Sequence, residues 1–364
     1  MTSEMPTSSG QDTTPHHSRR DFLRSAATAT AGFSLLGGLT FAGAKAAAKA
    51  TATSGSKGSA PQDESGEITF GIVTDLHHGL APDATQRLQA FMEAVDEHED
   101  LAFIAQLGDF CHPTADARDF VSLFDQFPGR KVHVLGNHDM DKGTKSETMR
   151  HWGMESRFGS FDAGDFHFVV LDLNNIRQVE GDKANYTHYD NANFYIDAEL
   201  RGWADPEQLA WLVDDLAAAN KQTIVFSHQP LGFSGPDQPL HQRQQEVLDI
   251  LYAANREARR TNPDAGQKVV ACLSGHLHVD RHERHNEVHC LSVNSASYHW
   301  AGGMHPYADP LFCFVTINPA GRIYIRGQHS EFTNAHPWQQ GLAMNTAGVT
   351  ASISDRAVVY RREG

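Results

Sequence analysis

The sequence predicts an α/β fold, because short apolar runs alternate with longer segments of helical periodicity. The runs 68–73, 101–107 and 223–226 have the length and the β-branched or aromatic content of buried strands. Between such runs, apolar residues recur every three or four positions, as they do on one face of a helix. Polar clusters directly follow several of the runs, and ligands of α/β sheets gather at these strand ends.

The composition is compatible with a globular protein that binds metal ions. The 364 residues suffice for one large domain or two smaller ones, and a hydrophobic content of 40% can form a core. A formal net charge of -15 and a pI of about 5.8 argue against a broad nucleic-acid or anionic-membrane surface. Bound metal ions could still create a local positive site. The 22 histidines are numerous, so their placement decides what they do.

Residues 1–44 resemble a twin-arginine signal peptide. The basic segment Ser18–Arg24 contains Arg19 and Arg20 and precedes a dilute apolar stretch over 26–44 that ends in small residues. A transmembrane anchor is the alternative, and the Ser, Thr and Gly of the stretch disfavour it. We therefore expect export by the Tat machinery to the periplasm or beyond, no stable membrane anchor, and a linker over 45–66.

The next hundred residues are expected to alternate regularly between strand and helix. The strand at 68–73 is followed by a helix over 83–97, whose apolar residues lie on one face. The same order then repeats until a fourth strand is reached. The further expected strands are 101–107, 131–135 and 166–171, and the further helices are 115–126 and 146–152.

The second half begins with a segment in which strands and helices no longer alternate. Residues 174–204, rich in Asn, Asp and Tyr, are expected to be long and irregular, which in a compact domain often marks function or disorder. Asp205 and Pro206 then predict a helix start. We interpret Arg281–His285 as a polar hairpin turn. The other expected elements are a helix near 242–257 and strands at 223–226, 269–273, 288–292, 312–317 and 323–327. We therefore expect one domain over 67–330, followed by a C-terminal tail over 331–364.

Five polar clusters lie at the carboxyl ends of the expected strands. They supply seven nitrogen or oxygen donors and no thiolate, which suits zinc, iron or manganese. Seven donors are too many for one tetrahedral site but suit two metals that share a carboxylate. Within Asp-x-His and His-x-His, residues i and i+2 would face the same side if the chain were extended. The donors are Asp75, His77, Asp109, Asn137, His228, His276 and His278.

A pair of metal ions suggests a class of reaction. Two ions a few ångströms apart can activate a water molecule and stabilise charge on a transferring phosphoryl group. Phosphoester hydrolysis is therefore the leading use of such a site. Peptide-bond cleavage, as in two-metal aminopeptidases, is another use of the same arrangement.

Taken together, the motifs resemble the calcineurin-like metallophosphoesterase superfamily. Asp-x-His, Gly-Asp, Gly-Asn-His-Asp, a later His and Gly-His-x-His occur in the family order within about residues 67–330. The resemblance implies a four-layer α/β/β/α sandwich with mixed sheets. It also implies that Asp109 bridges two metal ions, that Asp75, His77 and His278 hold the first ion, and that Asn137, His228 and His276 hold the second.

The resemblance further implies a role for the motif's histidine. His138 would donate a proton to the leaving group or stabilise the transition state, and Asp139 would orient its imidazole. His78 and His112 flank the site and are candidates for substrate contact. His112 stands where the family's purple acid phosphatases carry a metal-bound tyrosine, so the pattern is closer to the family's phosphodiesterases.

We therefore expect an exported binuclear phosphohydrolase that cleaves phosphodiester or pyrophosphate-type bonds by metal-activated hydroxide. A phosphomonoesterase using the same site is the first alternative. A non-catalytic metal-binding scaffold is the second, although such a protein would be expected to lack a ligand or His138. The four cysteines, Cys111, Cys272, Cys290 and Cys313, permit no assignment of disulfides, and pairing of Cys290 with Cys313 is only one possibility.

Overall fold

The computed structural model describes residues 66–233, 241–263, 266–334 and 349–360. All of these belong to one compact unit, Gly58–Gly364. The expected signal over 1–44 and nearly all of the expected linker lie outside the described residues. Among the helices that are described, none combines the length and the apolar character that crossing a bilayer requires.

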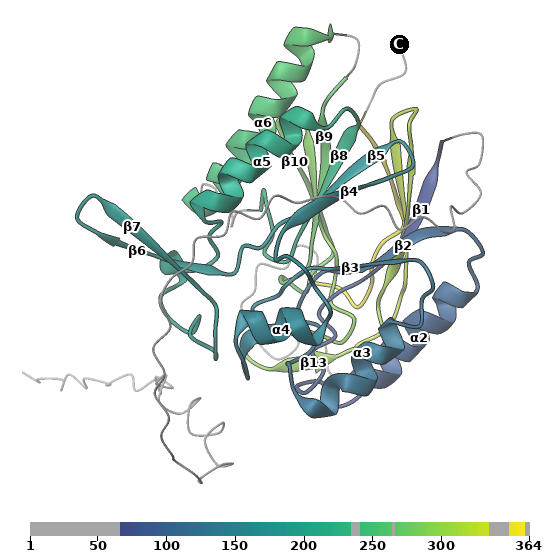
Figure 1. Ribbon diagram of the computed structural model, residues 1–364. Helices are drawn as coiled ribbons and strands as arrows, with labels where there is room; N and C mark the ends of the chain where they lie inside the picture. Colours follow the sequence, from purple (N-terminus) through teal and green to yellow (C-terminus); the bar gives the residue numbers. More distant parts are fainter. Residues whose placement is uncertain (1–65, 234–240, 264–265, 335–348, 361–364) are drawn as a thin grey trace, which may run out of the picture. The chain divides into compact units, whose positions relative to one another are not determined.

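Two six-stranded mixed sheets form the centre of this unit (Figure 1). In the first sheet the strands lie in the order β16 (Arg356–Val359), β15 (Arg322–Gly327), β14 (Cys313–Asn318), β1 (Ile68–Val73), β2 (Leu101–Gln106) and β3 (Arg130–His133). In the second they lie in the order β10 (Arg281–His285), β11 (Val288–Ser292), β9 (Val269–Ser274), β8 (Gln222–Ser227), β5 (Phe166–Val170) and β4 (Gly159–Ala163). In the first sheet β1, β2 and β3 run parallel and β14, β15 and β16 continue it with antiparallel pairings, whereas in the second sheet four parallel central strands have an antiparallel strand at each edge.

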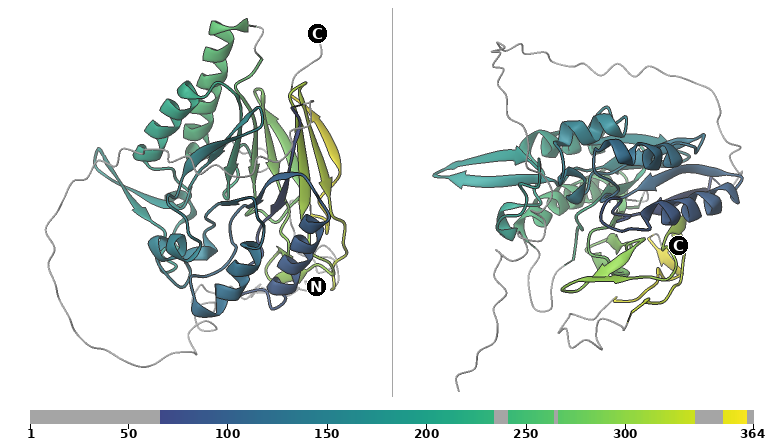
Figure 2. Two further views of the ribbon diagram at one scale, coloured as in Figure 1. Left: turned by 45° about the vertical axis from the view of Figure 1, so that its right-hand side comes forward. Right: turned by 90° about the horizontal axis from the view of Figure 1, so that it is seen from below.

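Helices cover the outer face of each sheet. Apolar residues of α2 (Ala84–Asp96) and α3 (Arg118–Phe124) pack on the first sheet. Those of α5 (Pro206–Ala218) and α6 (Gln242–Thr261) pack on the second, as the views in Figures 1 and 2 show. The predicted α/β/β/α layering is confirmed. As predicted, α5 begins at an aspartate cap, because the Asp205 carboxylate accepts the backbone N–H of Gln208 at 3.0 Å.

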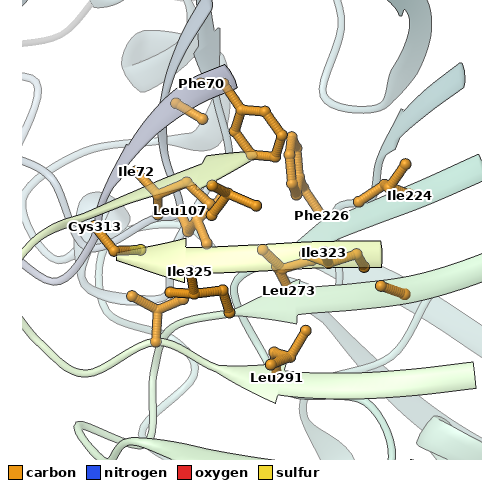
Figure 3. Packing of buried hydrophobic residues seen from close by; sticks show 14 of the residues in the cluster. Phe70, Ile72, Leu107, Ile224, Phe226, Leu273, Leu291, Cys313, Ile323 and Ile325 are labelled. Carbon is orange, nitrogen blue, oxygen red and sulfur yellow. The ribbon is translucent and has the colours of Figure 1, made fainter. Parts of the chain in front are cut away.

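The inner faces of the two sheets form the largest continuous apolar cluster (Figure 3). Phe70 of β1 is fully buried and stacks on Phe103 of β2, with ring centroids 4.5 Å apart. Across the interface, Phe226 of β8 packs edge-on against Phe70 at 5.9 Å. Because side chains alternate along a strand, the same strands also bury their other face against the helices. The site at the strand ends is thus held by two sheets whose central strands are buried on both faces.

The structure differs from the sequence-based expectation in three places. The segment 174–204 is not irregular throughout, because β6 (Asn175–Glu180) and β7 (Lys183–His188) form an antiparallel hairpin that extends from the sheets (Figure 2). Arg281–His285 is the edge strand β10, and not a turn. The segment expected as a tail supplies β16 to the first sheet. β6, β7 and β10 are largely polar because one or both of their faces meet water, and β16 is only four residues long, so none of the four strands has a long apolar run.

The remaining described elements are short. A second hairpin consists of β12 (Tyr298–Trp300) and β13 (Met304–Pro306). The helix α4 (Lys145–His151) begins at a capping box formed by Thr144 and Glu147. Single 3-10 turns lie at Ala115–Ala117, His138–Met140 and Ala198–Leu200. All four cysteines are free and buried.

Two polar clusters outside the strand ends hold the second sheet to its surroundings. The buried ammonium of Lys145 donates to Asp172 Oδ2 at 2.6 Å and to the carbonyl of Asn174 at 2.7 Å, at the base of the β6–β7 hairpin. On β5, His167 lies between Asp162 of β4 and Asp215 of α5, at 2.7 and 2.9 Å, and we call these three residues the His167 clamp. Burial lowers the pKa of His167, but the two carboxylates outweigh it and raise the pKa above its ordinary value.

Candidate metal centre

The carboxyl ends of β1, β2, β3, β8 and β9 meet at one edge of the two sheets, and the loops that follow them carry all seven expected donors. Six of the donors form two groups, and each group takes residues from both sheets. The first is Asp75, His77 and His278, and the second is Asp109, His228 and His276. Within each group the donor atoms lie within 4.8 Å of one another.

The first group is buried and tightly packed. His278 Nε2 lies 3.1 Å from Asp75 Oδ1 and 3.1 Å from His77 Nε2. His77 Nε2 is 3.8 Å from the same carboxylate oxygen. These three atoms therefore converge on one point, although they come from loops 201 residues apart in the sequence.

The donor atoms of the second group lie as close together as those of the first, and the carboxylate of Asp109 links the two groups. His228 Nε2 lies 3.1 Å from Asp109 Oδ2 and 3.2 Å from His276 Nδ1. The same oxygen of Asp109 is 3.8 Å from His77 Nε2 of the first group. Asp109 thus lies between the two groups, which is the position that a bridging ligand needs.

The donor atoms fit metal ions better than they fit one another. A single proton on His278 Nε2 cannot serve both its carboxylate and its imidazole neighbour. Donors about 2.1 Å from one ion lie about 3 Å apart when they subtend a right angle, and the closest contacts here have that length. Asn137 Oδ1 is buried without a hydrogen-bond partner, which suits an oxygen that awaits a cation.

Burial and charge keep several donors in the form that binds metal. Burial lowers the pKa of His77 and of His276 to about 3, so both imidazoles are neutral near pH 7. Burial alone would raise the pKa of Asp75, but His278 and His228 lower it to about 2. The buried His228, with Asp109 beside it, instead has its pKa raised to about 9, since the carboxylate outweighs desolvation.

The backbone of the ligands is unusual. Asp75, His77, Asp109, His276 and His278 all have positive φ, between 50° and 69°. Left-handed backbone is uncommon outside glycine and costs free energy, so it persists where the surroundings enforce it, typically at functional sites. The expectation that residues i and i+2 face one side because they are extended was therefore wrong. With a left-handed bend at each ligand, Asp75 and His77 both point into the first group, whereas His276 and His278 point into different groups.

Asp139 does not orient His138, so that prediction was wrong. Its carboxylate is buried and accepts four backbone N–H groups at 2.7 to 3.1 Å, from Gly136 and three consecutive residues of the loop after β2. Those three residues begin with Asp109, so Asp139 fixes the loop that carries the bridging position. Gly136 is required there, because a Cβ would collide with the backbone of Asp109.

The orienting partner of His138 is Asp141, which sequence reasoning missed. The carboxylate of Asp141 lies 2.8 Å from His138 Nδ1. Tyr195, on the segment after the β6–β7 hairpin, places its hydroxyl 3.4 Å from Asp141 and 3.3 Å from His138 Nδ1. Burial lowers the pKa of His138, but Asp109 and Asp141 outweigh it and raise the pKa to about 9. The imidazole is therefore protonated near neutral pH and can donate.

A cleft of about 480 Å³ opens beside Asn137, His138 and His276. The two flanking histidines expected at the substrate do not line it. His78 stacks on Phe120 at 4.4 Å, and His112 is buried with its Nε2 4.0 Å from Asp141. Both therefore support the loops under the site, and the residues that line the cleft come mainly from segments after the hairpin and before α6.

Comparisons with known proteins agree with this geometry. The family model described as calcineurin-like phosphoesterase matches residues 68–280. No curated protein matched the sequence. Among solved structures, phosphopantetheinyl hydrolase from Mycobacterium tuberculosis matches at 16% identity and a TM-score of 0.39, covering 64% of this chain and 91% of its own. A putative 5'-nucleotidase from Staphylococcus aureus matches at 12% identity and a TM-score of 0.42, covering 82% of this chain and 55% of its own. GAP50 from Plasmodium matches at 13% identity and a TM-score of 0.44, covering 80% of this chain and 97% of its own.

Proposed function

Because the chain belongs to the calcineurin-like phosphoesterase family and is a hydrolase of phosphoric esters, we propose that it is a binuclear metal-dependent enzyme that cleaves phosphodiester or pyrophosphate-type bonds. The observation that carries the proposal is the pair of buried donor groups at the carboxyl ends of both sheets, with Asp109 between them. Such a site is costly to bury unless it binds cations.

The chain's own residues would hold two ions in a defined way. Asp75, His77 and His278 form one set, and His228 and His276 with the unpartnered oxygen of Asn137 form the other. Imidazole and carboxylate donors without thiolate favour iron, manganese or zinc. When bound, the two ions would supply a water-derived nucleophile and stabilise negative charge at phosphorus.

His138 is the residue that would assist the departure of the leaving group. Its Nδ1 is held by Asp141, and a positively charged imidazole with a fixed orientation leaves Nε2 as the proton donor. Because His138 also lines the cleft, the leaving group would lie on the cleft side of the phosphorus. A cleft of about 480 Å³ next to the metal centre offers room for the leaving group of either ester, and the preference for a diester rests on the motif pattern.

The experiment compares ligand variants with matched controls on metal-reconstituted protein. Asp109→Ala and His228→Ala should abolish hydrolysis of bis(4-nitrophenyl) phosphate, whereas the exposed Asp119→Ala and His329→Ala should retain it. Full activity in both ligand variants would overturn the proposal. Inactive wild-type protein that still binds two equivalents of metal would favour the scaffold, and faster turnover of 4-nitrophenyl phosphate than of the diester would favour a phosphomonoesterase.

We also propose that the enzyme is exported through the twin-arginine pathway. The support is the sequence of Ser18–Arg24 alone, since this segment lies outside the described residues. Twin-arginine systems carry folded proteins, which suits a protein that takes up its metal ions before export. Replacing Arg19 and Arg20 by lysine should retain the precursor in the cytoplasm, and unchanged export of that variant would contradict the proposal.

A further inference from the structure

The cleft beside the metal centre is also lined by two arginines, Arg201 and Arg243. Each donates only to a backbone carbonyl in the described part of the chain, of Phe194 and Ala198 respectively, and neither forms an ion pair there. A third arginine of the cleft, Arg281, is instead neutralised by an adjacent glutamate.

No ion pair compensates Arg201 or Arg243 within the described residues. Burial lowers the pKa of Arg243, the charges of Glu199 and Tyr189 raise it, and the charge of Arg201 lowers it by a smaller amount. Glu199 lies 3.7 Å from His241 and forms no ion pair with Arg243, and its side chain is mostly exposed. Two arginines without a buried carboxylate partner in the described part of the chain leave a positive field in the cleft, which an anion would compensate.

The first turn of α6 also lines the cleft. His241, Arg243 and Gln244 all line it, and α6 is a 20-residue helix with no acidic residue in its first turn. The backbone N–H groups of Gln244 and Gln245 both donate to the carbonyl of His241. Gln244 is only 9% exposed, and its side-chain oxygen is buried without a partner among the described residues. This oxygen is an acceptor, so it suits a hydroxyl or amide hydrogen of a ligand, whereas binding of an anion depends on the two arginines.

Aromatic rings also line the cleft. Phe194 packs edge-on against His138, with ring centroids 5.5 Å apart, and Tyr195 lies against Phe194 at 4.2 Å. Both rings line the same cleft as His138 and the two arginines. A ligand bound in this cleft therefore meets apolar rings as well as positive charge.

We propose that the part of the cleft lined by Arg201 and Arg243 is a subsite for a second negatively charged group on the leaving group of the substrate. This inference rests on the proposed phosphoesterase function and extends it to a substrate class. The preferred substrates are diesters or pyrophosphate-type compounds whose leaving group carries a further phosphate or carboxylate. Charge-assisted bonds to guanidinium groups are strong and geometrically selective, so the subsite acts on specificity.

The test uses methyl aryl phosphodiesters that differ only at the para position of the aryl leaving group. The three probes carry a neutral carboxamide, a carboxylate or a phosphonomethyl group, and release of the phenol is measured by chromatography with the manganese-reconstituted protein. Wild-type kcat/KM should be about tenfold to a hundredfold higher for the anionic probes than for the carboxamide. The better of the two anionic probes then identifies the anion as planar carboxylate or tetrahedral phosphonate.

Substitutions locate the effect in the subsite. Arg201→Gln and Arg243→Gln should each reduce the preference for anionic probes severalfold or more, mainly through KM, and leave turnover of the carboxamide within about threefold of wild type. Arg256→Gln, at an exposed position of the same helix, is the matched control and should change neither value. Equal rates on all three probes, or a preference that survives both substitutions, would overturn the subsite. Failure of the wild-type protein to hydrolyse any probe would instead count against the proposed function.

Discussion

Replacement of Asp139 by alanine should destabilise the fold, whereas the same replacement of Asp141, two residues later, should not. The carboxylate of Asp139 accepts four buried backbone N–H groups, and alanine leaves all four without a partner. A buried donor without a partner costs about 1–3 kcal/mol, so four cost about 4 kcal/mol even at the low end. That is a large part of the about 5–15 kcal/mol that stabilises a typical domain.

Equilibrium unfolding in guanidinium chloride, monitored by tryptophan fluorescence on metal-free protein, measures this difference. Asp139→Ala should unfold at a markedly lower denaturant concentration, whereas Asp141→Ala should unfold within about 1 kcal/mol of wild type, because Asp141 contacts side chains at the edge of the cleft. Asp139→Asn should be intermediate, since its amide nitrogen faces two of the four donors. Unchanged stability of Asp139→Ala would refute the reasoning, as would an equal loss in both alanine variants.

The same pair separates structure from catalysis. Asp141→Ala removes the group that fixes His138, so activity should fall about 10- to 100-fold, which is part of the usual contribution of a general acid. The loss should be larger for an alkyl leaving group than for 4-nitrophenolate, which departs with little need for a proton. Equal losses on both substrates would show that Asp141 does not act through leaving-group protonation.

Three further outcomes are expected. Lys145→Met leaves the buried Asp172 with Arg157, at 3.4 Å, as its remaining cationic partner, so it should lower the unfolding free energy in a denaturant titration by less than the about 3–5 kcal/mol of a fully unpaired buried charge. The pKa of His167 is raised in the folded chain. The His167 clamp therefore stabilises the fold fully below a pH of about 6.5, and this stabilisation is lost as the pH rises through the raised pKa. The denaturant midpoints of wild type and His167→Gln should consequently differ more at pH 5.5 than at pH 9. Gly136→Ala forces its Cβ against the backbone of Asp109 and should lower bound metal, measured by elemental analysis, even where the protein still folds.

The sequence was most informative where several independent signals agreed. Apolar runs located the central strands, since strands buried on both faces must be apolar throughout. Polar residues placed directly after those runs had to meet at one edge of the sheets, because parallel strands share that edge. This is why the sequence alone could identify the members of both donor groups. The groups are Asp75, His77 and His278, and Asp109, His228 and His276.

The errors have an equally physical origin. Asp139 and Asp141 have the same side chain and nearly the same place in the chain, and only the three-dimensional course of the 3-10 turn decides which one meets backbone donors and which one meets His138. The left-handed backbone of the ligands is imposed by tertiary contacts and has no local sequence signal comparable to glycine. Tyr195 reaches His138 from a segment 57 residues away, across a hairpin that lacks an apolar run.

Each donor group draws residues from both sheets, and this has a consequence for the order in which the protein is made. Both groups include a histidine of the loop after β9, so neither group is complete until synthesis has reached His276 and His278. A shorter nascent chain can form the first sheet's parallel strands but can offer an ion only part of a binding set. A cation bound between His77 and His278 closes a loop of 201 residues, and closing so long a loop restricts the unfolded chain strongly. Metal uptake should consequently report on synthesis past His278, and chains that end before this residue should not draw on the metal supply of the cell.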